Sequence, residues 1–317
     1  MNCIYLISVA SAPAKVILFG EHFIVYGGKA ILCAIDKRIT VESELVDSAT
    51  IKIESDLGTV TISKSESIKN VDSKFRPVFF IAQKILQQSN LGIRISIKSE
   101  IPSGVGLGSS SACCVAAARS ISGLFKKTSK EEILKLALEA EKTVFENASG
   151  ADTTSCTYGG IMEYTKNGTK NVDVIPNFYL VIANSKIIHS TSDVVSRVKQ
   201  FKETHAEEFS LLCINEASLI EEAINSLNRN DLKKLGEKML VNQTYLHKIG
   251  VSNESLDAMI DSAKSVSYGA KITGAGDGGC IVALVDDSNL RATLDALSKY
   301  ECFSTKIDSI GVKEITP

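Results

Sequence analysis

Short runs of alternating apolar and polar residues dominate the first 100 positions of the chain. Alternation of this kind predicts antiparallel strands with one face in a core and the other toward solvent. The runs lie at residues 4–9, 15–19, 39–44, 50–54, 59–62 and 93–98. One helix, at 75–88, is expected to interrupt them, so the start of the chain is predicted to be mostly sheet.

The pattern changes to small residues after position 108 and then to a helical period. A helix is expected to begin after Ser129, because Glu132 three residues on completes a capping box. The later elements are predicted as strands at 160–164, 178–183, 270–273, 280–285 and 303–309 and helices at 193–226, 231–249, 254–266 and 290–300. The order predicts an α+β fold of two domains, 1–170 and 171–317, divided in the polar segment 166–176.

Composition removes several classes of function. The 317 residues carry 35 Lys+Arg and 37 Asp+Glu, a net charge of -2, so no basic surface for nucleic acid is expected. No apolar run approaches the roughly 20 residues that span a membrane. The eight cysteines show no CxxC pattern and no nearby His, which predicts reduced thiols in a cytoplasmic protein and no zinc site.

The segment 102–112 is the strongest local signal. Its three glycines would let backbone amides approach a ligand, and it leads into a helix whose first N–H groups favour an anion, so a polyphosphate is the expected guest. A glycine turn with a serine N-cap is the alternative. The candidate binding residues are Pro102, Gly104, Gly106, Leu107, Gly108, Ser109, Ser110 and Ser111. No Walker P-loop occurs in the chain.

A second glycine cluster, Lys271–Cys280, matches G-x-G-x-x-G. A dinucleotide site would need a helix directly after this loop, whereas the residues that follow it, Cys280–Val285, predict a strand. The cluster is therefore either a plain hairpin turn or a second loop that contributes to a site.

Two acidic residues are candidates for chemistry. Glu141 lies among apolar neighbours on its predicted helix, where a carboxylate must be paired or bind a metal, unless it reaches solvent at the edge of the stripe. Asp152 lies in a segment bounded by glycines that predicts a loop, and an Asp in a loop is often only an Asx-turn. Lys15 on the predicted strand 15–19, followed by Glu21 and His22, could likewise be an ordinary edge lysine.

Taken together, the segments 14–22, 102–112 and 271–280 resemble, in order, the three motifs of the GHMP small-molecule kinases. The patterns P-x-x-x-G-L-G-S-S and K-x-T-G-A-G-x-G-G-C are far more specific than one glycine loop. The turn Gly20-Glu21-His22, with no acid soon after it, is most similar to the branch that phosphorylates mevalonate. Ser111 departs from the family, where Ala is commoner, and no consequence of this departure is expected.

The resemblance implies a fold, cofactors and roles. The fold would pair an N-terminal domain like ribosomal protein S5 domain 2 with a ferredoxin-like C-terminal domain. ATP would bind the first glycine loop together with Gly274, Ala275 and Gly276, and Ser110 and Glu141 would hold Mg²⁺. Asp152 would accept or merely orient the proton of the substrate hydroxyl beside Lys15. Mevalonate would contact Glu21, His22, Asp152 and Thr191.

Two alternatives stay open from the sequence. One is a family member without catalysis, although Lys15, Glu141 and Asp152 are all retained. The other is a kinase for a different small alcohol, such as phosphomevalonate or a sugar. The sequence also leaves open whether the chain forms a homodimer.

Overall fold

The computed structural model describes residues 6–102, 104–146, 149–188 and 190–316. The predicted strand at 4–9 begins outside these ranges. Eight strands form the first sheet, in the order β12-β1-β2-β5-β3-β4, and β6 pairs with β2 and β7. The strands are β1 Ile7–Phe19, β2 Ala30–Val46, β3 Thr50–Ser55, β4 Gly58–Ser63, β5 Gly92–Ser99, β6 Ile161–Thr165, β7 Gly168–Asn171 and β12 Lys313–Ile315.

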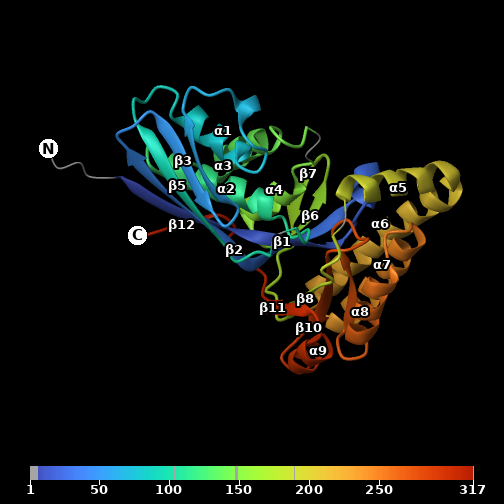
Figure 1. The fold of residues 1–317 in the computed structure, drawn as a ribbon. Coiled ribbons are helices and arrows are strands. Elements are labelled where there is room, and N and C mark those ends of the chain that lie inside the picture. Colours follow the sequence, from blue (N-terminus) through green and yellow to red (C-terminus); the bar gives the residue numbers. More distant parts are fainter. Residues whose placement is uncertain (1–5, 103, 147–148, 189, 317) are drawn as a thin grey trace.

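Four helices gather on one side of this sheet (Figure 1). They are α1 Arg76–Ile85, α2 Ser109–Gly123, α3 Lys130–Glu141 and α4 Ala151–Tyr158. The small residues of α2 let it pack closely on β1 and β2, and α3 and α4 pack against α2 in turn. The predicted capping box of Ser129 and Glu132 is present at the start of α3.

The second sheet contains β8 Tyr179–Asn184, β9 Gly269–Thr273, β10 Cys280–Val285 and β11 Glu301–Thr305, in the antiparallel order β11-β8-β10-β9. Its helices are α5 Thr191–Thr204, α6 Ala206–Asn228, α7 Leu232–Lys248, α8 Glu254–Lys264 and α9 Leu290–Ala296. Counted within this sheet, the strand order is 4-1-3-2. With helices between its first and second strands and between its third and fourth, this arrangement is ferredoxin-like. The α+β prediction is confirmed.

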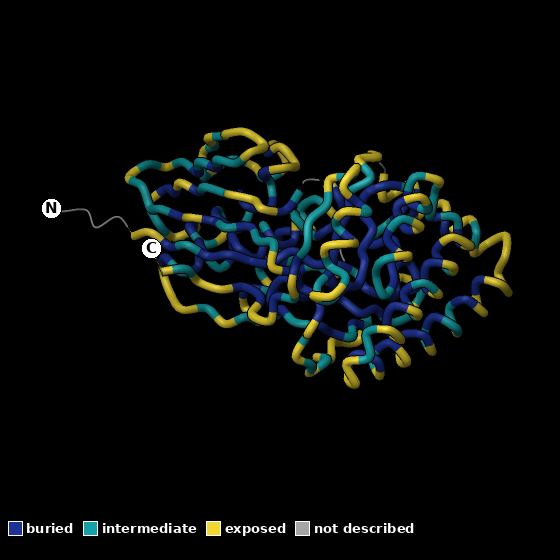
Figure 2. The backbone as a smooth tube through the Cα atoms, turned by 90° about the horizontal axis from the view of Figure 1, so that it is seen from below, coloured by how far each residue is buried: buried dark blue, intermediate teal, exposed yellow. Residues whose placement is uncertain are grey.

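One apolar core reaches from the first sheet to the second, and includes Phe19, Ile220 and Val282. A separate core lies between the second sheet and α5 to α9. In Figure 2 the buried backbone continues through both halves, and exposed backbone is confined mainly to loops and outer helix faces. Within the described residues, none of the helices has the length and apolar character that crossing a bilayer requires.

Several predicted elements differ from the structure. The runs at 4–9 and 15–19 belong to one long strand, β1, which a bulge at Pro13 and Ala14 bends without ending it. The predicted helix at 193–226 is two helices, because the backbone leaves the helical region at His205. The predicted loop around Asp152 was wrong: this segment forms α4, whose threonines and serine are buried by neighbouring elements.

The C-terminal strand also lies elsewhere than expected. Strand β12 pairs with β1 in the first sheet, although the predicted second domain extended to residue 317. A largely buried Arg38 gives the physical reason, since its guanidinium pairs with Asp308 and donates to the Gly311 carbonyl at 2.7 Å. The returning segment thus satisfies a charge that the first sheet buries.

Candidate active site

The first glycine loop forms one wall of a cavity of about 520 Å³. Gly104, Gly106 and Gly108 have φ values of 73°, 79° and 75°, a region in which other residues are strained. Gly108 is the N-cap residue of α2, and among the described residues no side-chain cap is formed at this helix start. The loop and the helix start therefore present backbone donors that suit phosphate.

Lys15 joins this loop to α4. Its Nζ lies 3.1 Å from Oδ1 of Asp152 and donates to the Gly106 carbonyl at 3.2 Å, and its side chain is almost fully buried. Its backbone N–H donates to the Leu107 carbonyl at 3.0 Å. Asp152 lies in the first turn of α4 and lines the cavity with about two-fifths of its side chain exposed. The structure thus brings together the predicted lysine, aspartate and phosphate loop.

Glu141, the last residue of α3, lines the same cavity but is only 6% exposed. Its two carboxylate oxygens accept hydrogen bonds from the hydroxyls of Ser111 and Thr153. Burial raises the pKa of Glu141, and the two hydroxyl donors act in the opposite direction. Among the described residues, no cluster of three or more His, Cys, Asp or Glu could hold a metal.

The donor set nevertheless fits Mg²⁺. This ion takes hard oxygen ligands and usually binds one or two carboxylates together with phosphates and water. Ser110 is exposed and lines the cavity together with Glu141. One hydroxyl and one carboxylate beside a phosphate loop are therefore enough for a magnesium ion that arrives with a nucleotide.

The Gly-Glu-His turn, which was predicted to contact the substrate, is buried. Glu21 is 1% exposed and pairs with Lys271 of β9. Burial raises the pKa of Glu21, and Lys271 lowers it. Glu21 does not line the cavity. The expected contact between Glu21 and substrate therefore finds no support in this geometry, because the carboxylate already binds a buried cation.

His22 has a positive φ of 61° at the start of the 3-10 helix Phe23–Tyr26. Its Nε2 lies 2.7 Å from the Ala275 carbonyl, so Nε2 carries the proton and donates. Burial lowers the pKa of His22. His22 thus ties the turn to the third motif.

The segment Thr273–Gly279, which contains the second glycine loop, contacts three parts of the site. Gly274 lies against Gly106 of the first glycine loop, and Ala275 accepts from His22. Thr273, just before the loop, bonds both the N–H and the carbonyl of Ile17. The predicted second glycine loop therefore lies beside the first, as part of one assembly and not as an isolated hairpin.

Thr191, the first residue of α5, lines the cavity opposite the glycine loop. Ser190 caps this helix by accepting from the Asp193 N–H at 3.3 Å. The neighbouring His189, part of the motif that suggested Thr191, lies outside the described residues. Further along α5, Arg197 pairs with Asp277 of the third motif at 2.8 Å.

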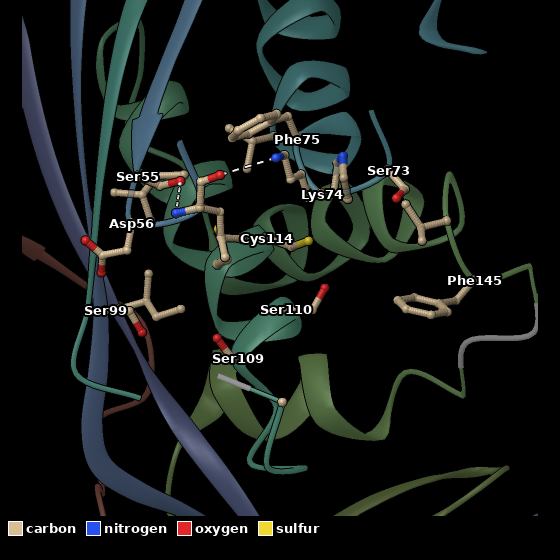
Figure 3. A pocket seen from close by; sticks show the side chains of 18 residues that line it. Ser55, Asp56, Ser73, Lys74, Phe75, Ser99, Ser109, Ser110, Cys114 and Phe145 are labelled. Carbon is tan, nitrogen blue, oxygen red and sulfur yellow. Dashed lines mark hydrogen bonds between the residues drawn. The ribbon is translucent and has the colours of Figure 1, made fainter. Parts of the chain in front are cut away.

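A second, mainly apolar cavity of about 370 Å³ adjoins the first and shares Gly104, Ser109, Ser110 and Phe145 with it. Figure 3 shows Ser55, Asp56, Lys74 and Phe75 around this cavity, with Ser109 and Ser110 at the side of the phosphate loop. The Lys74 ammonium donates to the Leu57 carbonyl at 3.3 Å and so fixes part of the wall. Sequence reasoning did not identify this cavity, because its lining comes from six separate segments of the chain.

Sequence reasoning missed other residues as well. It assigned no role to Thr153. It predicted Ser111 as a phosphate-loop residue but did not foresee its hydrogen bond to Glu141. Glu216 of α6 is 1% exposed, accepts the Gly20 N–H at 3.0 Å and binds Asn242 of α7. Its spacing from Leu212, Leu219 and Ile220 places it on an apolar helix face, and this signal could have revealed a buried carboxylate.

Comparison with known proteins gives consistent results. The family models for the GHMP kinases N terminal domain and the GHMP kinases C terminal match residues 76–160 and 220–301. The mevalonate kinase of Thermococcus sibiricus is 35% identical over 96% of this chain and 97% of its own length.

Solved structures of mevalonate kinases resemble this chain over nearly its whole length. The Methanococcus jannaschii mevalonate kinase superposes with a TM-score of 0.84 at 28% identity, covering 97% of this chain and 99% of its own. The L. major mevalonate kinase in complex with R-mevalonate gives 0.79 at 26% identity and covers 96% of each chain.

Proposed function

This chain belongs to the GHMP kinase family, and we propose that it transfers the γ-phosphoryl group of ATP to the 5-hydroxyl of mevalonate. The observation that carries the proposal is the ion pair of Lys15 and Asp152, 3.1 Å apart, beside a phosphate-binding loop. The assignment of mevalonate as the substrate rests on full-length relatives that are mevalonate kinases. The product serves isoprenoid biosynthesis.

The two cavities that adjoin the first glycine loop can accommodate the nucleotide. The phosphates would lie on Gly104–Gly108 and the start of α2, where three glycines in the left-handed region expose backbone donors. The adjoining apolar cavity behind Ser109 and Ser110 has the size and lining for the adenine and ribose. Ser110 and Glu141 would hold Mg²⁺, which neutralises phosphate charge during transfer.

The reaction would proceed between Asp152 and the phosphate loop. Asp152 faces the cavity, where its carboxylate can accept a hydrogen bond from the substrate hydroxyl and orient it. The Lys15 ammonium, 3.1 Å from this carboxylate, places positive charge next to the transferred group. Because phosphoryl transfer has a loose transition state, positioning and charge contribute more than base strength.

The substrate carboxylate would bind at the start of α5. Thr191 faces the cavity there, and the helix N-terminus favours an anion. Arg197, the basic residue a turn and a half further along, is already paired with Asp277. Arg197 is therefore not available to bind the phosphate group that phosphomevalonate carries. This favours mevalonate over phosphomevalonate as the substrate.

The decisive experiment measures ATP-dependent product formation with mevalonate, phosphomevalonate, galactose and homoserine. Mevalonate should react far faster than the other three, and phosphorus NMR should place the phosphate on its 5-oxygen. The Asp152→Asn variant serves as the matched control and should lose about 10²- to 10⁴-fold in kcat. Preference for another alcohol, or phosphate on the 3-oxygen, would refute the substrate assignment and leave the kinase assignment intact.

A further inference from the structure

The carboxylate of Glu141 is held from two sides. Ser111 of α2 donates its hydroxyl to Oε1, and Thr153 of α4 donates its hydroxyl to Oε2. All three side chains are buried, with 6% exposure at Glu141, 4% at Ser111 and none at Thr153. Three helices therefore meet at one carboxyl group.

Within the part of the chain that the structure describes, no Lys, Arg or His forms an ion pair with this carboxylate. Among the described residues, Lys15 is the one cation that acts on it, and the Lys15 ammonium is already bonded to Asp152 and to the Gly106 carbonyl. A buried carboxylate normally needs a paired charge or a metal. Two hydroxyl donors fix its orientation without neutralising its charge.

Each donor is adjacent in sequence to a residue of the reaction site. Ser111 follows Ser110, and Thr153 follows Asp152. Ser111 and Thr153 are each the third residue of their helix. A carboxylate accepts about four hydrogen bonds or metal contacts, and the two hydroxyls use two of them. The remaining positions on Glu141, which lines the cavity, stay available to a cation.

We propose that Ser111 and Thr153 are positioning residues that orient the Glu141 carboxylate for the magnesium ion of the bound nucleotide. This inference rests on the proposed function, in which Glu141 holds that ion. It gives a role to two buried hydroxyls that the reaction itself does not use, those of Ser111 and Thr153.

The test uses Mn²⁺ as a probe for the Mg²⁺ site. Binding of Mn²⁺ to the full chain saturated with a non-hydrolysable ATP analogue is measured by electron paramagnetic resonance. Ser111→Ala and Thr153→Val should each weaken Mn²⁺ binding, and the double variant should weaken it about tenfold or more, as is typical of residues that orient a metal ligand. Thr153→Ser should restore binding.

Two control variants remove buried hydroxyls on the same helices. Ser120 of α2 bonds the Ser8 carbonyl and Ser43, and Thr157 of α4 bonds the Thr153 carbonyl. Ser120→Ala and Thr157→Val should lower thermal stability but leave Mn²⁺ affinity unchanged. If Ser111→Ala and Thr153→Val likewise lower thermal stability without changing Mn²⁺ affinity, the role of these two residues is purely structural and the proposal is refuted.

Glu141→Gln separates failure of this inference from failure of the proposed function. If Glu141→Gln weakens Mn²⁺ binding and the Ser111→Ala/Thr153→Val double variant does not, the positioning role is refuted and Glu141 remains the ligand. If Glu141→Gln itself leaves Mn²⁺ binding unchanged, the assignment of Glu141 as a metal ligand is refuted, and the positioning role with it.

Discussion

Gly108 shows how a single backbone position controls the reacting groups. A Cβ atom built at this residue would lie 3.0 Å from Cγ and 3.1 Å from Cε of Lys15. The stem of Lys15 packs against this glycine, and its ammonium reaches Asp152. Any side chain at position 108 therefore pushes on the lysine that pairs with the aspartate.

We predict that Gly108→Ala lowers kcat by about 10²-fold, because small displacements of reacting groups have effects of that order. Gly160→Ala is the matched control. Gly160 has φ 76° against 75° at Gly108, but a Cβ atom at Gly160 would have no other atom within 4 Å. Both variants should lose about 1–2 kcal/mol of stability from the left-handed backbone. Equal activity in the two variants, measured by steady-state kinetics, would show that contact with Lys15 is unimportant.

At the scale of elements, the sequence predicted the helices and strands in which apolar residues recur at a clear helical or alternating spacing. The strands at 50–54 and 93–98 and the helices α3, α7 and α8 lie where alternation or helical spacing placed them. Helix α4 was missed because its sequence, ADTTSCTY, has no apolar stripe and few good helix formers. Packing against α2, α3 and β1 sustains it, and no local pattern records those contacts.

The same limit applies to the third motif. Its glycines are visible in the sequence, but its contacts join segments far apart in the chain. Gly274 lies against Gly106, Ala275 accepts from His22, and Asp277 pairs with Arg197. The candidate residues could therefore be identified from motifs, whereas the pairing of Glu21 with Lys271 could not. A motif shows which residue types are present. It does not show which of them bind other residues of the protein instead of a ligand.

Asp277 gives a prediction at this scale. It has φ 59°, where glycine would be less strained, and its carboxylate holds Arg197 of α5, whose other nitrogen donates to the Gly250 carbonyl at 3.2 Å. A partly exposed ion pair adds only about 0.2–1 kcal/mol of stability. Its expected effect is instead to hold α5, and with it Thr191, against the glycine loop.

Asp277→Gly should therefore leave thermal stability nearly unchanged but raise the KM for mevalonate about threefold to tenfold, with the KM for ATP unaffected. Arg197→Met should do the same, and the double variant should be no worse than either single one, because each single change already breaks the Arg197–Asp277 ion pair. Additive effects on KM, or none, would show that the pair does not position α5.

At the scale of the whole molecule, a buried polar network joins the two sheets. Glu21 lies just after β1 and pairs with Lys271 of β9, while Glu216 of α6 accepts from Gly20 and from Asn242. Desolvation raises the pKa of Glu216 to about 7, Asn242 acts against this rise, and nearby Glu21 adds to it. Two buried carboxylates therefore share one buried lysine at the junction.

This arrangement predicts a specific pH dependence of stability. In the unfolded chain Glu216 ionises near pH 4.5, whereas in the folded protein it keeps its proton up to about pH 7. Between these values the folded state binds more protons, so its stability falls as pH rises from about 4.5 to about 7 and then stops changing on account of this group. Glu216→Gln removes the dependence, and its neutral amide can still accept from Gly20 and bond Asn242.

Relative to the unaltered chain, Glu216→Gln should therefore gain about 2–3 kcal/mol in free energy of unfolding between pH 5 and pH 8. Urea titrations of both proteins at the two pH values measure this difference, and all groups common to the two proteins cancel. Glu222→Gln removes an exposed carboxylate from the same helix and is the control for the loss of one acidic side chain. An equal difference at pH 5 and pH 8 would mean that Glu216 ionises alike in both states, and the junction of the two sheets would then contain two permanent negative charges around Lys271.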